Sequence, residues 1–243
     1  MILIKNARVM DPESGFDQVT DILLDGKRIR QIGKVDDVSG IEQVIDASGM
    51  IAAPGLIDVH FHGCMGYDFC DGTKEAIEKI AEYEASQGVT TIVPATMTLS
   101  EEELMKIMAN GGSYENKEGS AVLAGINMEG PFICSKKKGA QAATHIHKPD
   151  VTMFRRLQDA ANGLIRLVDI APEEEGAMEF ISELKDEVHI SFAHTTADYD
   201  TAKTGYALGA CHATHLYNAM PPFTHREPGV IGAARDSEHC MVE

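Results

Sequence analysis

The sequence after residue 50 alternates short apolar stretches with helix-like segments, and this alternation restricts the possible folds more than any other feature. The expected strands are 56–60, 89–96, 121–130, 164–172, 188–195, 211–218 and a last one that begins at residue 239. Several of them are too apolar for a sheet with one face in water, and strands that alternate with helices form parallel sheets. The order predicts an α/β protein of the (β/α)8 TIM-barrel type.

The predicted barrel is incomplete, because six strand–helix units are complete and a seventh only begins. An eight-stranded barrel cannot close with two strands missing and would leave unpaired edges. Two alternatives remain open: the chain is a fragment of a longer protein, or it is not a barrel.

Two of the intervening helices carry clear boundary signals. Segment 100–112 starts with a capping box, Ser100 with Glu103, and is expected to end at Gly111. Segment 73–88 is expected to end at Gly88. Helices of this kind belong between the strands of a parallel sheet.

Residues 1–50 differ from the rest and predict a small, separate β unit. Segment 2–9 alternates apolar and polar residues, and segment 20–33 contains two strands joined by Asp25-Gly26, a dipeptide that favours tight hairpins. We therefore expect two regions, a β unit over 1–50 and an incomplete barrel with the functional site over 51–243.

Composition excludes several classes of partner. The 21 basic and 38 acidic residues leave a formal net charge of -17, which argues against nucleic acid and anionic membranes. The five cysteines form no CxxC pair, so we expect neither disulfides nor a thiolate zinc site, and a reducing cytoplasm. No stretch has the apolar length of a membrane span or an export signal.

Polar side chains recur where the predicted strands end. The candidates are His60, His62, Glu129, His194 and His215. Because the carboxyl ends of parallel strands meet at one rim, these side chains are expected to converge. Imidazoles and a carboxylate without thiolates predict a zinc, iron, manganese or cobalt site that keeps a position open for water. Such a site is typical of metal-assisted hydrolysis, and Glu129 would suit a carboxylate that bridges two ions.

A single histidine at a strand end is weak support for a metal site. His145 and His147 have the same spacing as His60 and His62, but they lie in a polar loop where solvated side chains are expected. The remaining histidines are assigned structural or surface roles: His189, His212, His225 and His239.

Five sequence blocks resemble a known family. The block "PGLIDVHFHG" is similar to the first-strand signature of the amidohydrolase superfamily. The blocks "MEGPFI", "KKKGAQ", "AHTTA" and "THLYNAMPPFTHREPG" resemble the N-acetylglucosamine-6-phosphate deacetylase family, and the resemblance extends from the N-terminal β unit to Glu243. It implies a barrel with part of a β-sandwich, one or two divalent ions, zinc first among them, and a cytoplasmic homodimer.

The resemblance also implies roles for individual residues. Glu129, His194 and His215 match the principal metal ligands, and His60 and His62 match a pair that is histidine in some members and amide-bearing in others. Further matches concern the substrate: Asn218 and Ala219 hold the sugar phosphate, partly through main-chain NH groups, Arg226 binds phosphate from the neighbouring subunit, and Ala140 lies beside the sugar. For Arg226 alone, a surface salt bridge with Glu227 is the simpler interpretation.

The implied reaction is hydrolysis of the acetamide of N-acetylglucosamine 6-phosphate to glucosamine 6-phosphate and acetate. The family's proton-transferring aspartate is expected beyond Glu243, and none of Asp58, Asp198 and Asp236 is a convincing substitute, although Asp58 suits a supporting role beneath His60. Two alternatives stay open: another amidohydrolase, such as a cyclic amidase or an aminohydrolase, and a catalytically silent, truncated chain that binds metal.

Overall fold

The computed structural model describes all residues from 1 to 243, and they form two compact units, Met1–Gly55 and Leu56–Glu243. The sequence placed this division after residue 50. The short strand β5 (Ile51–Ala52) pairs in parallel with β1 (Ile2–Asp11), so these residues belong with the first unit. A two-residue strand carries too little pattern to be recognised from the sequence.

The first unit is a single sheet built around β1. Its other strands are β2 (Phe16–Asp25), β3 (Arg28–Ile32) and β4 (Gln43–Asp46), in the order β3-β2-β1-β4 with β5 also beside β1. The β2–β3 hairpin closes where Asp25 pairs with Arg28, and Gly26 takes a φ of 57° in the turn, as the Asp-Gly signal predicts. The unit is therefore one five-stranded sheet, and its part in a sandwich stays a prediction.

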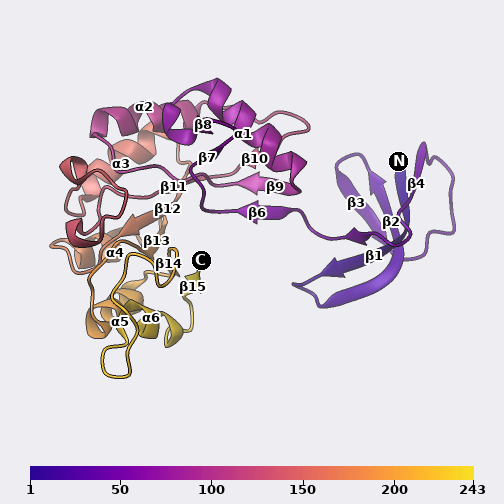
Figure 1. The fold of residues 1–243 in the computed structure, drawn as a ribbon. Helices are drawn as coiled ribbons and strands as arrows, with labels where there is room; N and C mark the ends of the chain where they lie inside the picture. The colour runs from indigo at the N-terminus through magenta and orange to yellow at the C-terminus, as the bar shows by residue number, and fades with distance from the viewer. The chain divides into compact units, whose positions relative to one another are not determined.

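The second unit is a run of parallel strands in chain order (Figure 1). They are β6 (Leu56–Asp58), β9 (Val89–Ile92), β10 (Val122–Leu123), β11 (Ile126–Met128), β12 (Ile165–Ile170), β13 (His189–Phe192), β14 (His212–Ala213) and β15 (Met241–Val242). A parallel bridge between Ala95 and Asn127 joins the sheet β6–β9–β10 to the sheet β11–β15. A small antiparallel pair, β7 (Gly63–Cys64) and β8 (Tyr67–Asp68), follows the first strand.

The third predicted strand, 121–130, is broken into β10 and β11 at Ala124-Gly125. A Cβ atom on Gly125 would lie 2.5 Å from Cγ of Arg166, so only glycine fits against the neighbouring strand here. Val122 and Leu123 pair with β9, whereas Ile126 to Met128 pair with β12. The two pieces thus act as one strand position in the barrel.

A helix follows each strand position except the last. The helices are α1 (Lys74–Ser86), α2 (Glu101–Gly112), α3 (Val151–Ala160), α4 (Ala177–Leu184), α5 (Tyr199–Leu208) and α6 (Gly229–Arg235), with short 3-10 turns η1 (Phe69–Asp71), η2 (Ser135–Lys137) and η3 (Ala143–His145). The capping box of α2 is present: the Ser100 hydroxyl accepts from the Glu103 NH, and the Glu103 carboxylate accepts from the Ser100 NH. The helix ends one residue after the predicted Gly111.

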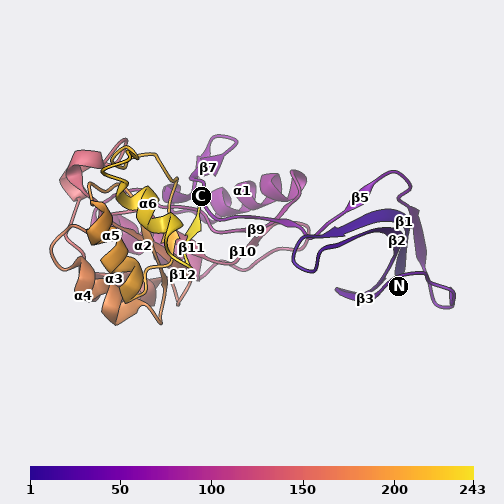
Figure 2. The same ribbon diagram turned by 90° about the horizontal axis from the view of Figure 1, so that it is seen from below.

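The core of this unit lies between the strands and the helices, which lie on the outer side of the sheet (Figures 1 and 2). Phe180 packs against Phe132 and Phe154, with ring centroids 5.3 and 5.7 Å apart, and Phe192 packs against Tyr206 at 4.5 Å. Close-packed aromatic rings fix the helices against the sheet. The carboxyl ends of the strands are thereby held at one rim.

The strands β6 and β15 are the two edges of the curved sheet, and they do not pair with each other. At the rim the edges approach, and Nδ1 of His60 lies 2.6 Å from Oε2 of Glu243. Between them is a hollow of about 700 Å³, lined by Leu56, Ile57, Asp58, Val59, His60, Val89, His215, Asn218 and Glu243. The barrel is therefore open along one side, as the strand count predicted.

Candidate functional site

The five predicted metal ligands meet around the carboxylate of Glu129, which follows β11 and is 2% exposed. Its Oε1 lies 2.8 Å from Nε2 of His194 and 3.4 Å from Nε2 of His215. Its Oε2 lies 3.2 Å from Nε2 of His62 and 3.7 Å from Nε2 of His60. Each oxygen of one carboxylate thus faces its own pair of histidines.

The position of His60 and His62 differs in one respect from the sequence prediction. They do not lie within an extended strand, because β6 ends at Asp58 and residues 59–62 are irregular. Asp58 accepts a hydrogen bond from the His60 NH at 3.1 Å, which turns the chain at the strand end. Both imidazoles still reach Oε2 of Glu129.

The donor set fits a divalent cation. Nδ1 of His194 lies 2.8 Å from the carbonyl oxygen of Lys137, and because a carbonyl only accepts, this nitrogen carries the proton. Nε2 of His194 faces the Glu129 carboxylate at 2.8 Å and lies 3.2 Å from Nε2 of His215. Glu129 Oε2, His62 Nδ1 and His215 Nδ1 are buried without a hydrogen-bond partner. Of these atoms, Glu129 Oε2 faces Nε2 of His60 and Nε2 of His62 at 3.7 and 3.2 Å, so a cation held among them would satisfy it.

The two ligand groups are each compact enough for one ion. His60, His62 and Glu129 offer ligand atoms within 4.8 Å of one another, and so do Glu129, His194 and His215. Nitrogen and oxygen ligands without thiolate are those of hydrolytic metal sites. Glu129 belongs to both groups.

The electrostatics follow from this crowding. Burial alone would lower the pKa of His60, but the carboxylates of Glu129 and Glu243 outweigh it and raise the pKa from 6.5 to about 10. Burial opposes ionisation of Glu129, yet the surrounding histidines, His194 and His215 foremost, hold its pKa well below the usual range. The carboxylate therefore remains ionised and available as a ligand.

Sequence reasoning missed three groups near the site. Glu243 holds Nδ1 of His60, and the rule that found the histidines, polar residues at strand ends, applies to it equally. Asp169 on β12 is fully buried, and its Oδ1 accepts from the Thr214 hydroxyl at 2.9 Å; a single carboxylate inside an apolar strand was the signal. The Lys137 carbonyl could not be recognised from the sequence, because every residue has a main-chain carbonyl whatever its side chain.

The rim carries an unusual number of left-handed residues with side chains. His194 has a φ of 46°, His215 of 35°, Tyr217 of 77° and Ala219 of 52°. Such conformations are uncommon for residues other than glycine and persist only where the surroundings enforce them. Here they include two of the candidate ligands and two residues of the loop that follows β14.

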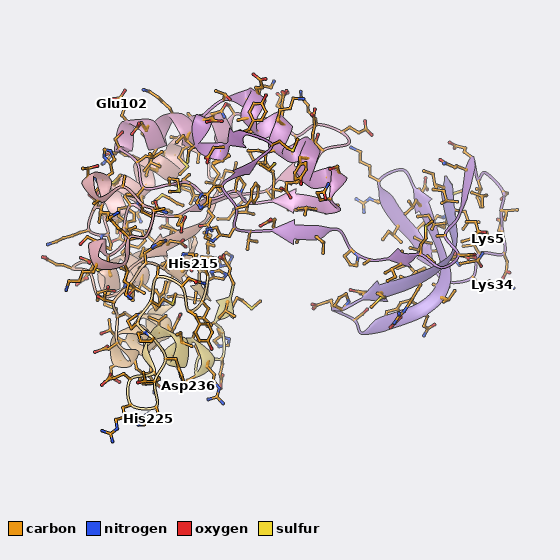
Figure 3. The ribbon with its side chains drawn as sticks, viewed as in Figure 1. Lys5, Lys34, Glu102, His215, His225 and Asp236 are labelled. Atoms are coloured by element: carbon orange, nitrogen blue, oxygen red, sulfur yellow. The ribbon has the colours of Figure 1, made fainter.

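The predicted substrate residues lie on loops of the same rim, with one exception. The Asn218 NH donates to the His215 carbonyl at 2.9 Å, which leaves the Asn218 side-chain amide and the Ala219 NH for a ligand. Ala140 is exposed in the loop after η2. Arg226 is exposed too, but its neighbour His225 lies at the tip of a loop far from His215 (Figure 3). Within one chain, Arg226 is not brought to the ligands.

Other candidates are engaged elsewhere. Asp198 caps α5, and Asp236 accepts from the Tyr199 hydroxyl at 2.9 Å, so neither points to the ligand group. His212 is half-buried and pairs with the Ser191 hydroxyl at 2.9 Å, which is a structural role. Lys137 donates to the Met220 carbonyl and thereby ties two rim loops together.

Comparison with known proteins identifies the family. The model of the amidohydrolase family matches residues 51–242. The chain belongs to the amidohydrolase family. The matched range covers all the strands of the second unit and every ligand candidate described above, so the family assignment rests on the part of the chain that holds the site.

Individual relatives are more specific. N-acetylglucosamine-6-phosphate deacetylase of Bacillus subtilis (strain 168) is 40% identical over 198 residues, which cover 79% of this chain and 50% of that protein. The crystal structure of N-acetyl-D-glucosamine-6-phosphate deacetylase from Mycobacterium smegmatis superposes with a TM-score of 0.88 at 26% identity, over 100% of this chain and 63% of that one. A variant of that enzyme in complex with N-acetyl-D-glucosamine-6-phosphate gives a TM-score of 0.87. This agreement confirms the predicted fold.

The chain spans about half the length of the curated relatives it matches. None of its helices has both the length and the apolar character needed to cross a bilayer.

Proposed function

We propose that this chain carries the metal-binding part of an enzyme that hydrolyses the acetamide of N-acetylglucosamine 6-phosphate to glucosamine 6-phosphate and acetate. The observation that carries the proposal is the convergence of four imidazoles on the two oxygens of Glu129. The names of its relatives support the choice of substrate.

Glu129, His194 and His215 would hold one divalent ion, and Glu129, His60 and His62 a second. Zinc is our first choice, and iron, manganese and cobalt suit the same ligands. A bound divalent cation would polarise the acetamide carbonyl and acidify a water molecule. The four histidines keep Glu129 ionised. Hydrogen bonds to the surrounding chain orient the imidazoles of His60 and His194, and burial of Glu129 shields the site from bulk water.

The phosphate would be held away from the ligands. The Ala219 NH and the Asn218 amide are available on the loop after β14, and Ala140 would lie beside the sugar. A chain with a net charge of -17 repels a phosphosugar unless a guanidinium meets it with paired hydrogen bonds. The exposed Arg226 would bind the phosphate held by the neighbouring subunit of a homodimer. We place this homodimer in the cytoplasm.

The test is acetate release from N-acetylglucosamine 6-phosphate by the 243-residue chain, supplied with zinc and separately with ferrous iron. We expect turnover that falls about a thousandfold or more in Glu129→Gln, since the metal contributes several kcal/mol to transition-state stabilisation. Turnover would also mean that the proton-transferring acid lies within these residues. A chain that binds zinc but releases no acetate would favour the silent alternative.

The phosphate side is tested separately with Arg226→Ala. Loss of charge-assisted hydrogen bonds should raise KM for the phosphosugar about 10- to 100-fold. N-acetylglucosamine without phosphate is the control substrate, and its turnover should not change. Equal effects on both substrates would favour a different amidohydrolase activity.

A further inference from the structure

A carboxylate outside the ligand group holds the turn that follows His194. Glu173 lies just beyond β12 and is half-buried. Its Oε2 accepts from the Thr195 hydroxyl at 2.5 Å, and its Oε1 accepts from the Thr196 NH at 2.5 Å and from the Thr196 hydroxyl at 2.9 Å. We propose that Glu173 is a positioning residue for His194 and for the loop that carries Asn218 and Ala219.

The turn needs such a support because His194 has a φ of 46°. A residue with a side chain keeps this conformation only where its surroundings enforce it. The Cys134 NH donates to the His194 carbonyl at 2.9 Å, and His194 Nδ1 donates to the Lys137 carbonyl at 2.8 Å. These bonds fix the residue from one side, and Glu173 fixes the two residues after it from the other.

The same turn reaches the loop after β14. The Thr195 NH donates to the Ala219 carbonyl at 3.1 Å, and Ala219 itself has a φ of 52°. Thr195 is fully buried, so its hydroxyl has no water to replace Glu173 as an acceptor. A displaced Thr195 would therefore shift Ala219 together with His194. Glu173 thus connects a metal ligand to the proposed phosphate loop.

A metal site at Glu173 itself is the competing interpretation. Cys134, Glu173 and Glu174 offer three ligand atoms within 4.8 Å of one another. However, both oxygens of Glu173 already accept hydrogen bonds from the Thr195–Thr196 turn, and burial raises the pKa of the Cys134 thiol, which disfavours the thiolate that a metal requires. The positioning role accounts for the observed contacts of Glu173 without a metal ion at this place.

The experiment compares Glu173→Gln with Glu174→Gln in the 243-residue chain. Glutamine keeps the size of Glu173 but turns an NH2 group towards the threonine donors. We expect the zinc dissociation constant, measured by competition with a chromophoric chelator, to rise about 10- to 100-fold in Glu173→Gln. Amide hydrogen exchange over 214–220, measured without metal, should become faster. The neighbouring Glu174→Gln, whose carboxylate makes no hydrogen bond to Thr195 or Thr196, should bind zinc and exchange amide hydrogens as the unaltered chain does.

A second pair of variants applies if Glu173→Gln folds poorly. Thr195→Val removes the hydroxyl that donates to Glu173 and should weaken zinc binding, whereas Thr195→Ser keeps the hydroxyl and should restore it. Unchanged zinc affinity and exchange in Glu173→Gln, or equal losses in Glu174→Gln, would overturn the inference.

The zinc measurement rests on the metal site of the proposed function. An unaltered chain that binds no zinc overturns that proposal and, with it, the part of the inference that concerns His194. The exchange measurement tests the connection to Ala219 independently, because it needs neither metal nor substrate.

Discussion

The five candidate ligands form two halves, His194 with His215 and His60 with His62. Both halves share Glu129, but they follow different strands of the sheet. His194 and His215 follow β13 and β14, which have a paired strand on both sides, and their side chains are 8% and 25% exposed. His60 and His62 follow β6, an edge strand, and their side chains are 15% and 36% exposed. Strand pairing on both sides holds a ligand more firmly than pairing on one. We therefore expect the first ion to bind at the His194–His215 half.

The largest effect should come from substituting the histidines of one half of the candidate ligands at a time. His194→Ala should lose the tightly bound zinc and reduce acetate release about a thousandfold, since the metal contributes several kcal/mol. The double variant His60→Gln, His62→Asn should lose only a second, weaker ion. Metal analysis after dialysis measures zinc per chain in both. Equal losses in the two variants would show that the halves do not differ.

A smaller effect is expected from the carboxylate that orients His60. Glu243→Gln replaces an ionic acceptor 2.6 Å from Nδ1 with a neutral one, and we expect about tenfold weaker binding of the second ion. Zinc titration of the chain with its first site filled is the measurement. Glu238→Gln is the matched control, because Glu238 is exposed and near the same chain end. If both variants bind zinc alike, Glu243 does not support His60.

A further effect concerns the stability of the fold beneath the His194–His215 half, and it leaves the metal ligands themselves unchanged. Asp169 is fully buried, its Oδ2 has no partner, and its Oδ1 accepts from Thr214, the residue before His215. Burial raises its pKa well above 3.8, so the folded chain favours the protonated acid. Its contribution to stability is present below about pH 4 and is lost as the pH rises through the raised pKa.

Comparison with Asp169→Asn isolates this contribution, because asparagine does not titrate. The free energy of unfolding of the metal-free chain, relative to that of the variant, should fall with rising pH by about 1.4 kcal/mol for each unit of pKa difference. Urea unfolding between pH 4 and 8 measures it. A difference that is constant with pH would mean that Asp169 ionises as freely in the folded chain as in the unfolded one.

Much of this arrangement could be predicted because it depends on local pattern. Apolar stretches, the Ser100–Glu103 box and the Asp25-Gly26 turn each carry their signal within a few residues. The ligand group could also be predicted, since parallel strands bring their carboxyl ends to one rim. Two of the groups around it could not, because Lys137 contributes a main-chain carbonyl and Glu173 bonds to a turn that is distant in sequence.

The details of the strands were less predictable for a related reason. The break between β10 and β11 depends on the approach of Arg166, and β5 is recognised only by its pairing with β1. Both are consequences of tertiary contacts. The resemblance separates the principal ligands from the more variable pair His60 and His62, but the strand pairing on which we base the expected difference in metal binding is seen only in the structure.

The left-handed residues of the rim bear on attempts to engineer a sturdier protein. Tyr217 and Ala219 adopt conformations that glycine takes without strain, so glycine there would relax the backbone. The same substitutions would loosen the loop that presents Asn218 and release the constraint that Thr195 passes on to it. Selection for heat resistance alone would thus favour changes that loosen this loop, and screens should score heat resistance and acetate release together.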